Sequence, residues 1–151
     1  MFVARDMSSI GAMFDKASGE ATEVFGDGTM YMERYVENAR HVEVQIVGDG
    51  SGAVSHIGER ECSVQRRHQK LVEIAPSPSI TPAVREAVTA AAVRLAQAVN
   101  FRSLGTFEFL VDESNDRDFF FIETNARLQV EHTVTEEVSG IDLVQAQLRI
   151  A

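Results

Sequence analysis

The chain has 151 residues, 44% of them hydrophobic, which is enough to build one domain with a buried core. Its formal charge is -9, from 14 Lys plus Arg against 23 Asp plus Glu, and this argues against nucleic-acid binding, which depends on basic side chains. The single cysteine, Cys62, excludes an internal disulfide, and no signal peptide or long apolar run is found, so a cytoplasmic protein that does not enter a membrane is expected.

Residues 6 to 25 are predicted to form the first helix. Their apolar side chains recur at helical spacing, at Met7, Ile10, Met13 and Phe14. Gly19 and Gly26 are the expected stops, since glycine favours the end of a helix. The helix is expected to serve in packing.

From Met30 onward the apolar period changes to two, which is typical of β-strands. The alternation is clearest at Val42, Val44 and Ile46, which are separated by Glu43 and Gln45. Residues 48 to 52, Gly-Asp-Gly-Ser-Gly, lead into a second apolar run at residues 53 to 57, which predicts a β-hairpin. A phosphate-binding loop is the alternative, but no helix and no Lys-Ser/Thr pair follows these glycines, so no nucleotide is assigned to them.

The second half of the chain predicts one long helix, a further hairpin and a final helix. Thr81 and Pro82 supply an N-cap and a first-turn proline for a helix ending near Asn100. Its apolar face carries Val84, Val88, Ala91, Leu95 and Val99. Strands at 104 to 111 and 118 to 124 flank a polar turn at 112 to 117, and Ile141, Leu143, Val144 and Leu148 mark the last helix. Such an order predicts an α+β fold, an antiparallel sheet with helices packed on one face and the other face open for a ligand.

The hairpin after Gly105 predicts a pair of facing carboxylates. One register sets Val111 opposite Phe120, Phe109 opposite Ile122 and Glu108 opposite Glu123. It gathers Phe107, Phe109, Val111, Phe120 and Ile122 on a core face and Glu108, Leu110, Phe121, Glu123 and Asn125 on the other. The alternative register, slipped by one residue, leaves each glutamate an ordinary exposed residue but mixes core and solvent residues on one face.

Two carboxylates with Cβ atoms about 5 Å apart need a cation between them. Glu108, Glu123 and Asn125 offer hard oxygen ligands without a nearby histidine or cysteine, which suits Mg²⁺ or Mn²⁺. Such an ion can share its ligands with substrate phosphates, so the acidic charge of the chain does not exclude ATP. The pattern therefore predicts a metal and nucleotide site.

Basic residues cluster between positions 60 and 70, at Arg60, Arg66, Arg67, His68 and Lys70. Such a cluster can bind an anion. A solvated strand edge, where basic side chains discourage pairing with other sheets, is the alternative. The segment from Glu123 to Glu137 is more informative, because functional side chains crowd directly after a predicted core strand.

Three runs of sequence carry a resemblance to a known family. They are residues 32–43 (MERYVENARHVE), residues 59–70 (ERECSVQRRHQK), and residues 105–109 (GTFEF) followed by 123–137 (ETNARLQVEHTVTEE). These runs resemble biotin carboxylase, the ATP-grasp component of acetyl-CoA, propionyl-CoA and pyruvate carboxylases. The resemblance implies that bicarbonate attacks the γ-phosphate of ATP and that the resulting CO₂ is transferred to biotin.

The resemblance also implies a role for individual residues. Lys70, Arg127, Gln129 and the backbone of Val130 resemble the bicarbonate pocket, and Glu131 resembles the general base, for which a pKa raised by burial is expected to help. Glu108, Glu123 and Asn125 match the family's metal ligands. Glu33, Arg34, Val36, His41, Gln65, His68 and Leu110, together with Glu108 and Glu123, resemble the ATP contacts.

The family has a glycine-rich lid loop and a C-terminal domain that these residues do not match. Residues 1 to 151 are therefore expected to be a single ATP-grasp fragment, truncated at both ends and inactive alone. The resemblance implies a biotin carboxyl carrier and a carboxyltransferase as partners, and a homo-oligomer for the complete subunit. A non-catalytic ATP-binding module of the same fold and another ATP-grasp ligase, such as a carbamoyl phosphate synthetase relative, are the alternatives.

Overall fold

The computed structural model describes residues 2–114 and 118–151, and the chain divides into two compact units. The first unit, Met1–Val36, contains one helix, α1 (Ile10–Phe25), which ends at Gly26 in the left-handed conformation. The predicted stop at Gly19 is wrong, because a single glycine costs a helix interior only about 1 kcal/mol. Residues 27–36 form neither helix nor strand, so the alternating segment begins later than Met30.

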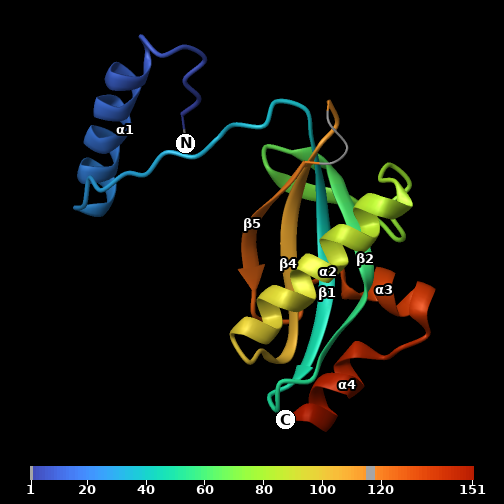
Figure 1. The fold of residues 1–151 in the computed structure, drawn as a ribbon. Coiled ribbons are helices and arrows are strands. Elements are labelled where there is room, and N and C mark those ends of the chain that lie inside the picture. The colour runs from blue at the N-terminus through green and yellow to red at the C-terminus, as the bar shows by residue number, and fades with distance from the viewer. Residues whose placement is uncertain (1, 115–117) are drawn as a thin grey trace. The chain divides into compact units, whose positions relative to one another are not determined.

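The second unit, Glu37–Ala151, contains an antiparallel sheet of five strands in the order β3-β2-β1-β4-β5 (Figure 1). The strands are β1 (Ala39–Asp49), β2 (Val54–Arg66), β3 (Gln69–Ile74), β4 (Arg102–Asp112) and β5 (Phe119–Asn125). The helices are α2 (Pro82–Ala98), α3 (His132–Ser139) and α4 (Leu143–Ile150). The antiparallel α+β architecture predicted from the sequence is confirmed.

Helix α2 covers the apolar face of the sheet (Figure 1). It begins as predicted, with the Thr81 side chain accepting a hydrogen bond from the backbone N–H of Val84 at 3.3 Å. The core between helix and sheet holds Val84, Val88, Ala91 and Ala92 of α2, Val42, Val44 and Ile46 of β1, and Phe107, Phe109 and Val111 of β4. The side chains that alternate with these on β1 and β4 therefore face the other way.

The β4–β5 hairpin pairs Glu108 with Glu123 as predicted, but a β-bulge at Ile122 changes the rest of the register. Beyond the bulge, Val111 pairs with Phe119 instead of Phe120, and Phe109 pairs with Phe121 instead of Ile122. The predicted core positions Phe120 and Ile122 were therefore wrong. The aromatic rings that meet Phe109 are those of Phe119 and Phe121, with centroids 5.9 and 5.7 Å away.

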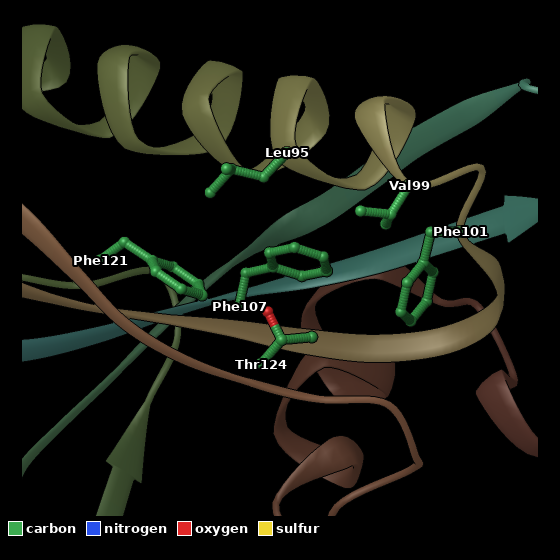
Figure 2. A pocket seen from close by; sticks show the side chains of 6 residues that line it. All are labelled: Leu95, Val99, Phe101, Phe107, Phe121 and Thr124. Carbon is green, nitrogen blue, oxygen red and sulfur yellow. The ribbon is translucent and has the colours of Figure 1, made fainter.

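An apolar hollow of about 360 Å³ lies between the end of α2 and the β4–β5 edge of the sheet (Figure 2). It is lined by Leu95, Val99, Phe101, Phe107, Phe121 and Thr124. Leu95 and Val99 are exposed, so the last turn of the predicted apolar face of α2 is not covered by the described residues.

The polar turn at 112–117 falls partly on residues 115–117, which lie outside the described residues. Among the residues that the structure describes, no helix has the length and apolar character needed to span a membrane.

Phe109 provides a test of the core. It is fully buried between β1, α2 and the rings of β5, so Phe109→Ala is expected to lower the free energy of unfolding by about 3 to 5 kcal/mol. Urea denaturation followed by circular dichroism measures this. Leu148→Ala, at a side chain that is 72% exposed, is the control and should change stability by less than about 0.5 kcal/mol. A loss at Phe109 no larger than the control's would contradict the packing described.

Candidate active site

The polar face of the sheet carries a row of charged residues on four neighbouring strands. Arg60 of β2 pairs with Glu43 of β1, Glu43 with Glu108 of β4, and Glu108 with Glu123 of β5. Arg60 and Glu43 are fully buried and Glu108 is 3% exposed, whereas Glu123 is exposed. Buried carboxylates on adjacent strands repel each other, so cations are needed to hold this row together.

Lys70 supplies one of these cations. Its ammonium group donates to Glu43 Oε2 at 2.6 Å, to Glu131 Oε1 at 2.8 Å and to Glu108 Oε1 at 3.1 Å. Burial acts to lower the pKa of Lys70, but the charge of Glu43 and the hydrogen bonds to Glu131 and Glu43 outweigh it and raise that pKa. The lysine therefore stays charged at the centre of three carboxylates.

The β2–β3 hairpin carries Lys70 to this position. Arg66 pairs with Gln69, so the turn consists of Arg67 and His68, both in the left-handed region with φ of 54° and 64°. Two such residues are characteristic of a type I′ turn, which glycine and asparagine normally occupy. The basic cluster of the sequence is thereby divided: Arg60 and Lys70 face the carboxylates, whereas Arg66, Arg67 and His68 are exposed around the turn.

Glu108 accepts hydrogen bonds from several sides. His41 Nε2 donates to Oε2 at 2.6 Å, and Gln129 Nε2 donates to Oε1 at 3.0 Å. Because an ionised carboxylate only accepts, the proton is on Nε2 of His41, and its Nδ1 accepts from Gln65 Nε2 at 2.7 Å. Burial acts to raise the pKa of Glu108, but these hydrogen bonds and the charge of Lys70 outweigh it and bring the pKa to about 2.

Glu131 lies at the start of α3, directly after the polar loop that follows β5. Burial is the largest single influence and acts to raise its pKa, as expected from the sequence, but the hydrogen bond from Lys70, a backbone hydrogen bond and the charges of Lys70 and Arg60 together outweigh it and lower the pKa. The expectation that burial raises the pKa of Glu131 above its ordinary value is therefore wrong. Glu131 is an ionised acceptor, held by Lys70 and able to accept a further proton.

Asn125 lies between the two carboxylates of the predicted metal site. Its Nδ2 donates to Glu108 Oε1 and to Glu123 Oε1, both at 2.9 Å. The three residues thus converge on one face, as the strand alternation predicts. Carboxylate and amide oxygens are the ligands that Mg²⁺ and Mn²⁺ prefer, and the exposed Glu123 leaves the group open on one side, so these residue types fit a divalent ion.

The side chain of Gln129 has a buried oxygen that can accept a further hydrogen bond. Its Nε2 is used by Glu108, while its Oε1 is the single buried side-chain polar atom without a hydrogen-bond partner in the described part of the chain. A buried acceptor left unpaired costs about 1 to 3 kcal/mol, so a donor group is expected to bind beside Gln129. The hydroxyl of a bicarbonate ion is such a donor.

Other predicted site residues lie outside the cluster of carboxylates around Lys70. Arg127 is exposed, and among the described residues its one hydrogen bond is to the backbone oxygen of Leu128 at 3.3 Å; Val130 is 91% exposed. His68 lies at the β2–β3 turn, whereas Leu110 pairs with His41 beside the cluster. Glu33, Arg34 and Val36 belong to the first unit, and their contacts with ATP remain a prediction.

The sequence interpretation did not identify Glu43 and Arg60 as members of the site. The sequence placed Glu43 on the polar side of a strand and gave it no role. In the structure Glu43 lies next to His41 and Glu108, and one possible ligand atom from each of the three residues lies within 4.8 Å of the other two. Alternation along β1 could have suggested that Glu43 faces the same way as Glu108. The pairing of β1 with β4 was needed to show that they are neighbours.

The antiparallel sheet, with an acidic side and an apolar side covered by a helix, agrees with the ATP-grasp-like fold predicted above, and the solved structures described below share it. The chain belongs to the family described as carbamoyl-phosphate synthase L chain, ATP binding domain, whose model matches residues 1–151.

Similar proteins are biotin-dependent carboxylases. Pyruvate carboxylase of Aspergillus niger is 52% identical over 151 residues, which are 100% of this chain and 12% of that protein. The biotin carboxylase–beta-gamma-ATP complex from Campylobacter jejuni has a TM-score of 0.89 and 47% identity, over 99% of this chain and 33% of that one. The biotin carboxylase domain dimer of Hydrogenobacter thermophilus 2-oxoglutarate carboxylase, in complex with MgADP, ADP and bicarbonate, has a TM-score of 0.85 and 45% identity, over 99% and 32% of the two chains.

The coupling of Lys70 to Glu131 can be measured directly. Lys70→Met removes the hydrogen bond that lowers the pKa of Glu131 but leaves its burial, so that pKa is expected to rise above the wild-type value. A pH titration of the glutamate side-chain carbons by NMR measures the shift. The lowered pKa also implies that this contact stabilises the fold above the ordinary pKa of 4.5 and that its contribution is lost as the pH falls.

Arg149→Met is the control for the loss of one positive charge, since Arg149 donates to Gln145 within α4. It should leave the titration of Glu131 unchanged. An equal shift in both variants, or none in Lys70→Met, would mean that Lys70 does not control Glu131.

Proposed function

We propose that the chain forms part of the active site of a biotin carboxylase, which uses ATP and bicarbonate to carboxylate biotin. The convergence of Lys70, Gln129 and Glu131 next to Glu108 carries this proposal. It combines a positive charge, an unpaired buried acceptor and an ionised carboxylate within one polar cluster. The proposal is further supported by the biotin-dependent carboxylases to which the chain is similar, one of them solved with MgADP and bicarbonate.

In this proposal bicarbonate binds between Lys70, Gln129, Arg127 and the backbone of Val130. Its hydroxyl donates to Gln129 Oε1, and Lys70 and Arg127 bind its negative oxygens. The hydroxyl then turns from Gln129 to Glu131, which accepts its proton, and an oxygen of the resulting carbonate attacks the γ-phosphorus of ATP while ADP leaves. The product, carboxyphosphate, breaks into CO₂ and phosphate. The released phosphate accepts the proton of the ureido nitrogen of biotin, and that nitrogen then forms a bond to CO₂. Arg127 stabilises the negative oxygen of the deprotonated biotin.

The nucleotide is proposed to lie along the same polar face. Glu108, Glu123 and Asn125 would hold Mg²⁺ or Mn²⁺, which neutralises the phosphate charges when bound. The remaining ATP contacts are proposed for Glu33, Arg34, Val36, His41, Gln65, His68 and Leu110. His41 and Gln65 support this assignment, because they already form a hydrogen-bonded chain that ends on Glu108.

The partners and setting follow from the same proposal. A biotin carboxyl carrier and a carboxyltransferase are required to present biotin and to use the carboxyl group, as subunits or as domains of one chain. The dimer of the 2-oxoglutarate carboxylase domain supports a homo-oligomer. A cytoplasmic, reducing setting is proposed because Cys62 is a buried free thiol.

The metal site is tested by titrating Mn²⁺ and recording water-proton relaxation. Glu123→Gln removes one of two facing carboxylates, so Mn²⁺ affinity is expected to fall about 10-fold or more, and further in the double variant with Glu108→Gln. Glu137→Gln, at an exposed residue of α3, is the matched control. Unaltered affinity in the double variant would place the ion elsewhere.

The reaction is tested in the full-length protein by measuring bicarbonate-dependent phosphate release from ATP with free biotin. Arg127→Ala is expected to reduce biotin-dependent turnover about 10²-fold with little change in Tm, because Arg127 is exposed and donates to the neighbouring carbonyl of Leu128. Arg94→Ala, at an exposed residue of α2, should leave turnover unchanged. Phosphate release by the wild type that does not depend on bicarbonate would contradict the proposed function.

A further inference from the structure

Arg60 is a fully buried arginine that joins the centre of the sheet to helix α3. Its Nε donates to Glu43 Oε1 at 2.6 Å, and its Nη1 donates to Gln45 Oε1 at 2.9 Å. Nη1 also donates to Thr135 Oγ1 at 2.7 Å, and Thr135 is 1% exposed on the inner side of α3. One guanidinium group thus holds a strand carboxylate and the helix that begins directly after Glu131.

Glu43 passes this constraint on to Lys70. Its Oε1 accepts from Arg60, and its Oε2 accepts from Lys70 Nζ at 2.6 Å. With both oxygens in charge-assisted hydrogen bonds, the carboxylate cannot rotate without breaking one of them. The direction in which Glu43 holds the Lys70 ammonium group therefore depends on Arg60.

Stability alone does not explain a buried Arg60–Glu43 pair. Replacing a buried ion pair with apolar residues of similar size is often neutral or stabilising, because removing two charges from water is costly. A lysine could neutralise Glu43, but only the planar guanidinium offers donors in fixed directions to Glu43 and Thr135 at the same time. The geometry indicates that orientation is what this residue contributes.

We propose that Arg60 is a positioning residue for the reaction, which fixes Lys70 through Glu43 and fixes Glu131 through the Thr135 contact with α3. Arg60 touches neither Lys70 nor Glu131 in any hydrogen bond of the described residues, so it acts through its two partners. The role in turnover rests on the function proposed above. The role in holding α3 is a property of the fold and can be measured without any activity.

The test uses Arg60→Lys in the full-length protein, with two readouts. Amide hydrogen exchange of residues 132–139 is expected to become faster, while exchange in α2 stays at the wild-type rate. Bicarbonate-dependent phosphate release is expected to lose about 10- to 100-fold in kcat with KM for ATP nearly unchanged, because misplaced groups slow the chemical step. The loss should not add to that of Glu43→Gln in the double variant, since both changes release the same lysine.

Arg85→Lys is the matched control. Arg85 of α2 forms a similar pair with the buried Glu59, at 2.6 Å, on the side of the sheet that α2 covers. It should change neither α3 exchange nor kcat. Thr135→Val is the second variant if Arg60→Lys does not fold, because it removes the α3 contact and keeps the Glu43 pair. Valine should also accelerate exchange in residues 132–139.

The outcomes separate the two proposals. Unchanged α3 exchange in both Arg60→Lys and Thr135→Val, or an equal increase in Arg85→Lys, would overturn the positioning role. Faster exchange with wild-type kcat would overturn its importance for the reaction. A wild-type protein without bicarbonate-dependent phosphate release would refute the proposed function, and the exchange data would still decide whether Arg60 holds α3.

Discussion

Several glutamates are buried on one face of the sheet, and their negative charges must be neutralised by cations. The contacts that neutralise them determine how the strands and helix α3 are held together on this face. Glu43, Glu108 and Glu131 all lie within hydrogen-bonding distance of the Lys70 ammonium group. With Glu123, four carboxylates meet the two positive charges of Lys70 and Arg60, so the cluster retains a net negative charge. The excess of negative charge is the basis for the divalent ion proposed at Glu108 and Glu123.

The two faces of the sheet are consequently stabilised by different kinds of interaction. Toward α2 the side chains are apolar and close-packed, and the helix is held by burial. Toward α3 the contacts are directional hydrogen bonds. Arg60 of β2 donates to Thr135, and Lys70 of β3 donates to Glu131. The β1 and β4 strands belong to both layers, so the packed side gives a rigid support to the side on which the reaction is proposed.

Much of this fold is encoded in short patterns. Helix α2 was predicted from Thr81, Pro82 and its spacing of apolar residues, and the Glu108–Glu123 pairing from alternation within one hairpin. Longer-range features were not accessible, because the register of β1 against β4 joins segments about sixty residues apart. Strand β3 was missed because Arg67 and His68 form a turn that usually contains glycine or asparagine.

The burial of Arg60 was beyond sequence interpretation for a related reason. Arginine is rarely buried unless paired, and its partners, Glu43 and Thr135, come from distant parts of the chain. Glu131 is a similar case, since burial alone would raise its pKa, and the contacts that lower it include Lys70 and Arg60 from other strands. Local sequence shows which groups are available, and only the tertiary pairing shows which charges face each other.

The bulge at Ile122 has a consequence for how β5 can change over evolutionary time. On one side of it Phe119 and Phe121 pair with core residues, and on the other side Glu123 pairs with Glu108. Side chains alternate strictly along a regular strand. The additional residue at the bulge therefore lets Phe119 and Phe121 face the core while Glu123 faces the polar side. The number of residues in β5 is therefore more constrained than the type of residue at position 122. Deleting one residue would turn the side chains at one end of β5 to the opposite face of the sheet, whereas exchanging the side chain at 122 would not.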